Sequence, residues 1–198
     1  MTQLNRRLAL CALAWLAACS PDKPSPAAFK AIDITGAEYA RELALPDASG
    51  KPRTLADFKG KVTIVFFGFT QCPEVCPTAL AEIAAVKQKL GADGAKVQAV
   101  FVTVDPERDT PEVLAAYVKN FGSDFVALRG SLEETKAAAK QFKVFFAKAP
   151  GKTEGAYTMD HSAGSFVFDP QGRIRLFIRH DGGAEAMAGD VKLLLGGA

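Results

Sequence analysis

Two cysteines, Cys72 and Cys76, have the residue type and spacing that point most directly to chemistry. They stand in the run F-T-Q-C-P-E-V-C-P, residues 69–77, between a strand-like stretch and a stretch with helical periodicity. Thiols with this spacing fall about one helical turn apart and can face the same point. The N-terminus of a following helix stabilises the thiolate form. The pair can therefore form a disulfide or offer two soft ligands to one metal ion.

Structural interpretations of the same pair are less attractive. Buried cysteines can act as small hydrophobic residues, but a strand-to-helix junction is where reactive groups gather in open α/β sheets. A purely structural disulfide would close a very small loop and add little stability. Two cysteines are too few for a closed zinc site or an iron–sulfur cluster, and soft thiolates also select Cu(I). A metal site would need another ligand, and the sequence offers two imidazoles, His161 and His180.

The elements that must position these side chains alternate between strand and helix. Residues 62–69 form a continuous β-branched and aromatic run, which is typical of a central strand covered on both faces. Apolar residues recur at helical spacing over residues 78–90, and Gly91 follows as a stop signal. The sequence then predicts, in order, a strand over 97–104, a helix capped by Thr110 and running to about 121, a strand over 125–128, and a helix from a capping box at Ser131 to about 142.

The last third of the chain favours an antiparallel arrangement. The turn signal D-P-Q-G, residues 169–172, separates apolar stretches over 165–168 and 173–178, and a final helix is expected over about 184–195. Residues 43–58 predict a short hairpin that enters the domain. A parallel half joined to an antiparallel hairpin is the element order of the thioredoxin fold. We therefore predict one α/β domain of thioredoxin-like fold: a central mixed sheet, helices on both faces and an extra N-terminal β-hairpin.

This topology separates the two histidines. His161 lies in the polar segment 157–164, which we expect to be a loop, and a thioredoxin-like chain order brings that loop beside the cysteine turn. His180 ends the outer strand of the predicted hairpin next to Arg179, and we expect it to be solvated. The sequence therefore predicts that His161 joins the two cysteines.

The composition excludes several classes of protein. The 198 residues carry 24 Lys+Arg against 22 Asp+Glu with no basic run, so the chain has no electrostatic footprint for nucleic acid. With 48% hydrophobic and 23% charged residues it does not resemble a disordered chain, and no apolar stretch is long enough to span a bilayer. With these classes excluded, the composition indicates an ordinary globular domain with a tail.

The N-terminus carries the features of an export signal. Arg6 and Arg7 precede an uninterrupted apolar run, residues 8–18, which ends at Cys19. The sequence L-A-A-C at the end of this run is similar to a bacterial lipobox, in which the cysteine is acylated and becomes the new N-terminus. The alternative is an ordinary signal peptide with a chance cysteine.

These features predict three parts of the chain. We expect a signal peptide over 1–18 with cleavage before Cys19, a flexible proline-containing tether over 19–34, and a folded domain over 35–198. The domain would face the periplasm or the outside of the cytoplasmic membrane. Its contact with the membrane would be through the lipid at Cys19 only.

Three motifs in the same order give the chain a resemblance to the Sco/SenC family of copper proteins, in its bacterial lipoprotein form. They are C-P-E-V-C-P at 72–77, V-D-P-E-R-D-T-P at 104–111 and Y-T-M-D-H-S at 157–162, and the resemblance extends from about Leu43 to the C-terminus. Proteins of this family serve the assembly of cytochrome c oxidase. The resemblance implies three ligands that bind copper as both Cu(I) and Cu(II): Cys72, Cys76 and His161.

Two carboxylates in these motifs are candidates for a supporting role. By resemblance, Asp105 maps near the site and Asp160 lies beside the ligand histidine; either could orient the imidazole or offset the charge of the metal without binding it. Asp105 can equally form a turn with Pro106. For Asp109 we favour a structural role in capping the following helix, with Arg108 as its partner.

Two functions fit these residues. The first is a membrane-tethered copper-binding protein that delivers copper to the dinuclear copper site of cytochrome c oxidase subunit II, because a three-coordinate site leaves room for ligand exchange. The second is a thiol–disulfide reductase in which Cys72 and Cys76 keep the cysteines of that same site reduced. One protein could do both. Further partners implied are another copper chaperone or a thioredoxin-like reductant.

Two related classes of enzyme fit poorly. Thiol peroxidases of this fold have the pattern P-x-x-x-T-x-x-C, which would need Pro in place of Val65 and Thr in place of Phe69. Thioredoxin-like reductases have W-C-x-x-C and a proline in the facing loop. Here Gln71 precedes the first cysteine, the spacer is one residue longer, and residues 151–169 contain no proline. General disulfide exchange is therefore disfavoured, whereas reduction of one specific substrate still fits.

Overall fold

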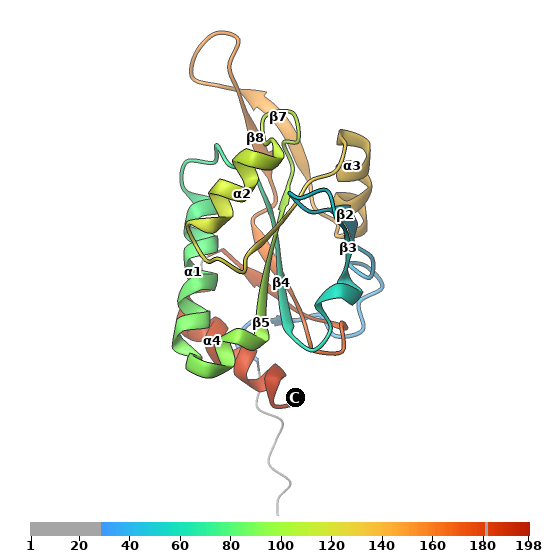
Figure 1. The fold of residues 1–198 in the computed structure, drawn as a ribbon, viewed down its shortest axis with the longest axis vertical. Coiled ribbons are helices and arrows are strands. Elements are labelled where there is room, and N and C mark those ends of the chain that lie inside the picture. Colours follow the sequence, from blue (N-terminus) through green and yellow to red (C-terminus); the bar gives the residue numbers. More distant parts are fainter. Residues whose placement is uncertain (1–28, 181) are drawn as a thin grey trace, which may run out of the picture.

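The computed structural model describes residues 29–180 and 182–198, which form a six-stranded mixed sheet at the centre of an α/β domain (Figure 1). The strand order is β1-β10-β9-β4-β5-β6. β4, β5 and β6 are parallel, whereas β9 pairs antiparallel with β4, β10 with β9, and β1 with β10. The predicted thioredoxin-like fold is confirmed. The strand bounds are β1 Ile32–Asp33, β4 Val62–Gly68, β5 Val97–Thr103, β6 Val126–Leu128, β9 Gly164–Phe168 and β10 Ile174–Arg179.

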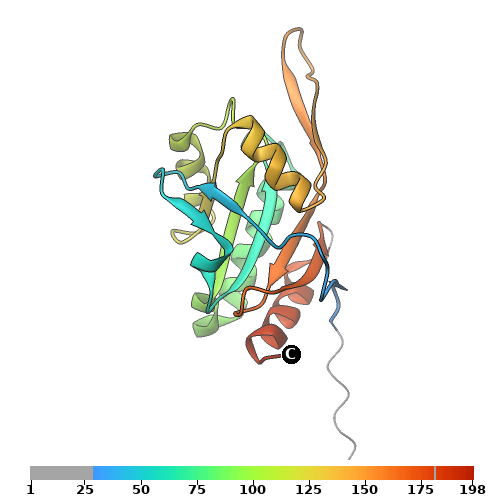
Figure 2. The same cartoon turned by 90° about the vertical axis from the view of Figure 1, so that its right-hand side faces the viewer.

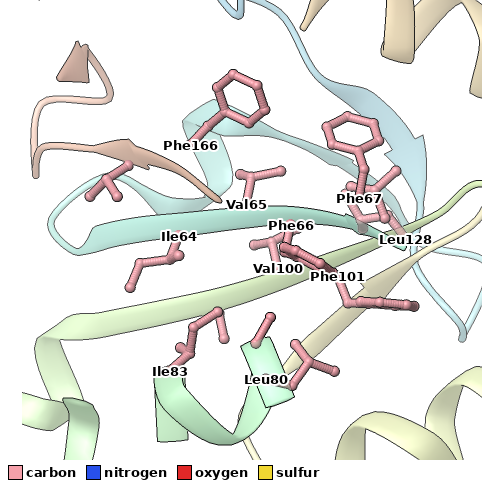
Figure 3. Close-up of a cluster of buried hydrophobic side chains, with 14 of the residues drawn as sticks. Ile64, Val65, Phe66, Phe67, Leu80, Ile83, Val100, Phe101, Leu128 and Phe166 are labelled. Atoms are coloured by element: carbon pink, nitrogen blue, oxygen red, sulfur yellow. The ribbon is translucent and has the colours of Figure 1, made fainter. Parts of the chain in front are cut away.

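Strand β4 is central because it is apolar on both faces. All of its residues are buried, and it pairs with β5 on one side and β9 on the other. Side chains alternate across a strand, so Val65 and Phe67 lie on one face and Ile64 and Phe66 on the other (Figure 3). Both sets contact apolar partners, and this is why the sequence shows a continuous run rather than an alternating one.

Helices cover both faces of the sheet (Figures 1 and 2). On one face Tyr117 of α2 contacts Phe101 of β5, with ring centroids 5.6 Å apart. On the other face Phe142, at the end of α3, contacts Phe67 at 5.0 Å. α1 and α4 share the face of α2. The helix bounds are α1 Val75–Lys89, α2 Pro111–Lys119, α3 Leu132–Gln141 and α4 Ala184–Leu195.

Two of the described helices, α2 and α3, begin where local capping residues predict. The Thr110 side chain accepts a backbone hydrogen bond from the first turn of α2, and Ser131 forms a capping box with Glu134 at the start of α3. α1 begins at Val75, three residues before the predicted start at residue 78. Cys76 therefore lies within the first turn of the helix rather than in the turn before it.

In the described part of the chain, two hairpins lie outside the central sheet. One is the predicted N-terminal hairpin, followed by a short 3-10 helix, and the other projects beyond the end of the sheet (Figure 2). A second short 3-10 helix follows α1. The bounds are β2 Ala44–Pro46, β3 Pro52–Thr54, η1 Leu55–Phe58, η2 Gly91–Lys96, β7 Phe146–Pro150 and β8 Tyr157–His161.

The projecting hairpin corrects the prediction of a polar loop over 157–164. β8 pairs antiparallel with β7 over their full lengths, and neither strand joins the central sheet. Met159 is the one buried residue of β8, so the strand lacks the alternating apolar pattern that identifies a half-buried strand. Strands that pair only with each other leave little signal in the sequence.

The predicted tether is wrong for its last residues. Ile32 and Asp33 form β1, and the backbone amides of Lys30 and Ala31 donate to the buried Asp190 carboxylate of α4, at 2.9 and 2.8 Å. The domain therefore begins before residue 35. The predicted signal peptide over 1–18, Cys19 and the tether up to residue 28 lie outside the described residues. Within the described residues no helix has both the length and the apolar character to cross a membrane.

Candidate metal centre

The cysteine turn joins the end of β4 to the start of α1. The Cys76 amide donates to the Cys72 sulfur at 3.3 Å, and the Cys72 amide donates to the Phe69 carbonyl at 3.3 Å. Cys76 is fully buried in the first turn of α1, whereas Cys72 is partly exposed. A side chain on Gly68 would place its Cβ 2.7 Å from the Cys76 sulfur, so β4 must end in glycine for the buried thiol to fit.

His161, the last residue of β8, meets this turn from the opposite side. Its Nε2 lies 3.5 Å from the Cys76 sulfur, and its Nδ1 donates to the Ser162 carbonyl at 3.0 Å. Because the carbonyl can only accept, the proton sits on Nδ1 and Nε2 is left free to bind a metal. The imidazole stands edge-on to the rings of Phe66 and Phe69, with centroids 6.2 and 5.8 Å away, which restricts its tilt.

The two thiols differ strongly in acidity. A hydrogen bond from the Cys76 side chain lowers the pKa of Cys72 to about 4 despite its partial burial, with smaller contributions from His161 and backbone amides. The same hydrogen bond, together with burial, raises the pKa of Cys76. Cys72 is therefore the thiolate at neutral pH, and Cys76 retains its proton until a metal or a reaction removes it.

The three side chains fit a soft metal ion. The two sulfurs and one imidazole nitrogen all lie within 4.8 Å of one another, and within the described residues this is the group of side chains identified as able to hold a metal. A surface pocket of about 360 Å³, lined by Cys72, Pro73, Val75 and His161 among others, borders the group on one side. Two thiolates and an imidazole match the preferences of copper, and the pocket leaves a side open to a further ligand.

Neither predicted supporting carboxylate contacts His161. Asp105 is buried, but it accepts from Tyr157 Oη at 2.9 Å and from Arg108 Nε. Asp160 is exposed on β8, and its side chain forms no hydrogen bond among the described residues, so the Ser162 carbonyl orients the imidazole instead. His180 is half-buried and lies outside the group of possible ligands.

Asp109 has a different structural role from the predicted one. Thr110, not Asp109, caps α2, and Arg108 pairs with Asp105. The fully buried Asp109 carboxylate instead accepts hydrogen bonds from the backbone amide and hydroxyl of Thr70, next to the cysteine turn, and from the Thr103 hydroxyl. Burial raises the pKa of Asp109. The motif over 104–111 marks Asp109 as a residue of interest, but the sequence does not reveal that its carboxylate binds Thr70, which is distant in the chain.

Comparison with known proteins identifies the family. A model of the SCO1/SenC family matches residues 33–196. The chain belongs to this family. Among curated Sco proteins, the mitochondrial SCO2 homolog of Mus musculus is 38% identical over 133 residues, which cover 66% of this chain and 52% of the mouse protein. The chain spans about half the length of the curated relatives it matches first.

Solved Sco structures share both the sequence and the fold. Bradyrhizobium japonicum ScoI, solved with copper bound, is 40% identical with a TM-score of 0.69, and the match covers 76% of this chain and 96% of that one. A SCO1/SenC family lipoprotein from Bacillus anthracis is 26% identical with a TM-score of 0.68, covering 84% and 99%. Copper is thus the metal found in a close Sco structure, in agreement with the donor set described above.

Proposed function

We propose that this protein is a membrane-tethered copper carrier that delivers copper to the dinuclear copper site of cytochrome c oxidase subunit II, with Cys72, Cys76 and His161 as the copper ligands. The observation that carries the proposal is the convergence of two thiols and an imidazole within 4.8 Å beside a surface pocket. The copper-bound relative and the resemblance to cytochrome c oxidase assembly proteins support the choice of metal and of partner.

The arrangement suits transfer rather than storage. Copper is the cargo, and a site with three protein donors keeps a position free for a ligand from the receiving protein. Cys72 and His161 border the pocket, whereas Cys76 is buried behind them. An incoming ligand would therefore replace the outer donors first, and the buried thiolate would be the last to release the ion.

A second function is supported by the unequal acidity of the two thiols. An accessible thiolate at Cys72 can attack one sulfur of a partner disulfide, which gives a mixed disulfide and releases a partner thiolate. Cys76 then loses its proton and attacks the Cys72 sulfur, which closes the disulfide and releases the second partner thiolate. Each cycle consumes two electrons, so an external dithiol reductant must restore the pair. The two functions are compatible in one protein.

We also propose that the protein is exported and held to the membrane by a lipid on Cys19. The N-terminal sequence and the existence of a lipoprotein in the same family support this. The domain would then face the periplasm or the outside of the cytoplasmic membrane.

The test compares wild type with His161→Ala in two assays, copper binding and reduction of a model disulfide. The carrier function predicts that the variant loses stable Cu(II) binding, while its dithiol still exchanges. Unchanged affinity for both Cu(I) and Cu(II) would remove His161 from the ligand set and contradict the proposed site. The reductase function is contradicted if the reduced protein cannot reduce the oxidised copper-binding domain of subunit II.

A further inference from the structure

The loop between β5 and α2 contacts both halves of the candidate metal centre. We call residues 105–109 the bridging loop; they belong to the motif V-D-P-E-R-D-T-P, and none of them is among the proposed copper ligands. One half of the centre is the cysteine turn, and the other is the β7–β8 hairpin that ends in His161. In Figure 1 the start of α2 and this hairpin lie at the same end of the molecule.

The bridging loop holds the hairpin through two polar contacts that do not involve Arg108. Tyr157 Oη donates to the Asp105 carboxylate at 2.9 Å, and Lys148 Nζ forms an ion pair with Glu107 at 2.6 Å. These contacts matter because β7 and β8 pair only with each other within the described residues and gain no support from hydrogen bonds of the central sheet.

Arg108 connects the hairpin to the cysteine turn. Its Nη1 donates to the Tyr157 carbonyl of β8 at 2.8 Å and to Gln71 Oε1 at 3.1 Å, and Gln71 immediately precedes Cys72. Its Nε donates to Asp105, and its guanidinium lies over the Tyr157 ring with 3.7 Å between the Cζ atom and the ring centroid. The guanidinium group of Arg108 therefore contacts both segments that supply the ligands, the cysteine turn and β8.

We propose that Arg108 is a positioning residue that holds β8 against the cysteine turn and thereby keeps His161 at binding distance from the two sulfurs. The inference rests on the proposed copper site and deepens it. Arg108 touches no ligand atom; it acts through Gln71 and Tyr157, whose backbones lead directly to Cys72 and, four residues on, to His161. Lysine cannot reproduce this, since it lacks a planar group that donates in several directions and stacks on a ring.

Arg129 offers a matched control. It is half-buried like Arg108 and also binds the bridging loop, with Nε donating to the Asp109 carbonyl and Nη2 to the Pro106 carbonyl, both at 2.9 Å. No hydrogen bond from Arg129 reaches the hairpin or the cysteine turn among those the structure describes. Arg129→Met therefore loosens the same loop without removing the connection between the two halves of the centre.

The experiment measures Cu(I) affinity of the full-length protein in Arg108→Met, Arg108→Lys and Arg129→Met, each with and without His161→Ala, because two thiolates remain to bind Cu(I) when the histidine is replaced. Removing a group that orients a metal ligand costs about 10- to 100-fold in affinity. We expect a loss in this range for both Arg108 variants and less than about threefold for Arg129→Met. In the His161→Ala background the Arg108 variants should cause no further loss, because the histidine they position is gone.

A second readout uses the metal-free protein. Amide hydrogen exchange over residues 157–162 should rise in both Arg108 variants and stay near wild type in Arg129→Met. If Arg108→Met does not fold, Arg108→Lys gives the same comparison with the charge retained. Equal effects of Arg108 and Arg129, or a full additional loss in the His161→Ala background, would overturn the inference. If His161→Ala alone leaves copper affinity unchanged, the proposed copper site itself fails.

Discussion

At the scale of single residues, the candidate centre depends on two neighbouring sulfurs having different properties. Cys72 is partly exposed with a pKa lowered to about 4, and Cys76 is fully buried with a raised pKa. The difference arises because Cys76 donates a hydrogen bond to Cys72 and lies deeper in the core. The Cys72 thiolate is thus available to bind a metal or to attack a disulfide, and in the proposed reductase reaction Cys76 would act second by attacking the Cys72 sulfur.

This asymmetry predicts the alkylation behaviour of the metal-free, reduced protein. The thiolate of Cys72 exists at any pH above about 4, so its rate of reaction with iodoacetamide should be nearly constant between about pH 5 and pH 8. An ordinary thiol gains reactivity steadily over that range. Mass spectrometry of single-alkylated protein should find the label on Cys72, and equal labelling of Cys76 would contradict the assigned burial.

Gly68 is predicted to be intolerant of any side chain. An added Cβ would lie 2.7 Å from the Cys76 sulfur and 2.9 Å from the rings of Phe101 and Phe66, none of which can move freely in the core. Overpacking of this kind costs about 1–3 kcal/mol, so Gly68→Ala should lower the free energy of unfolding by that amount in urea titrations.

The control for this prediction is Gly189→Ala in α4. A Cβ there meets no atom within 4 Å, and replacing a helical glycine by alanine gains about 0.5–1 kcal/mol. The two substitutions should therefore act in opposite directions. A Gly68→Ala protein as stable as wild type would show that the buried thiol has more room than the structure gives it.

At the scale of elements, what the sequence could predict depended on how each element is stabilised. β4, β5 and the helices bury one or two continuous apolar faces, so their patterns are visible, and the capping residues mark α2 and α3 to within a residue. β1 is short and pairs with the distant β10, whereas β7 and β8 pair with each other and contact the distant bridging loop through polar side chains. No local pattern records such contacts.

The residues of the candidate site also divide into those that the sequence could predict and those that it could not. The two cysteines and His161 were predictable because their residue types are rare in this chain and suited to a metal, and because the topology brings the ends of their segments together. Arg108 and Asp109 were not predictable, because their charges find partners in Tyr157 and Thr70, far away in sequence. An arginine next to an acidic residue is more simply explained as a local ion pair.

A carboxylate in the N-terminal hairpin predicts how the stability of the fold changes at low pH. Burial raises the pKa of Asp47, but hydrogen bonds from Ser49, Arg53 and the backbone amide of Lys51 outweigh it and bring the pKa to about 2, below the ordinary value of 3.8. A carboxyl with a lowered pKa stabilises the fold above its unfolded pKa and loses that contribution as the pH falls through its folded pKa. The contribution of Asp47 should therefore disappear between about pH 4 and pH 2.

Thermal denaturation of Asp47→Asn measures this contribution. The variant should melt several degrees below wild type at pH 7, and the difference should shrink as the pH approaches 2. Asp57→Asn serves as a control on an exposed carboxylate of the same region, with a smaller expected effect at pH 7. A constant difference between Asp47→Asn and wild type from pH 7 to pH 2 would contradict the assigned cause.

At the scale of the whole molecule, the candidate centre and the start of the described chain lie at opposite ends. The cysteine turn follows the C-terminal end of β4, at the same end as the β7–β8 hairpin, whereas β1 and α4 lie at the other end (Figure 1). Asp190 of α4 fixes the chain at Lys30 and Ala31. With a lipid on Cys19, this arrangement would direct the copper site away from the point of attachment.

Lipid attachment itself predicts a change in cell fractionation. Cys19→Ser should move the protein from the membrane fraction to the soluble exported fraction, because the apolar run before it is too short to span a bilayer. Cys11→Ser is the matched control, since it changes a cysteine within the proposed signal peptide, and it should leave the protein on the membrane. Tight membrane association of Cys19→Ser after processing would contradict the anchor.

Delivery of copper from this protein to oxidase subunit II can be followed in a mixture of purified proteins. The most direct measurement mixes the copper-loaded protein with the metal-free, reduced copper-binding domain of subunit II and follows the absorption spectrum of the dinuclear site. We expect this spectrum to appear as copper leaves the wild-type protein, and we expect much less transfer from His161→Ala, because loss of the imidazole should weaken Cu(II) binding. If the copper stays with the wild-type protein while the same domain is readily loaded by free copper ions, delivery of copper to subunit II by this protein is contradicted.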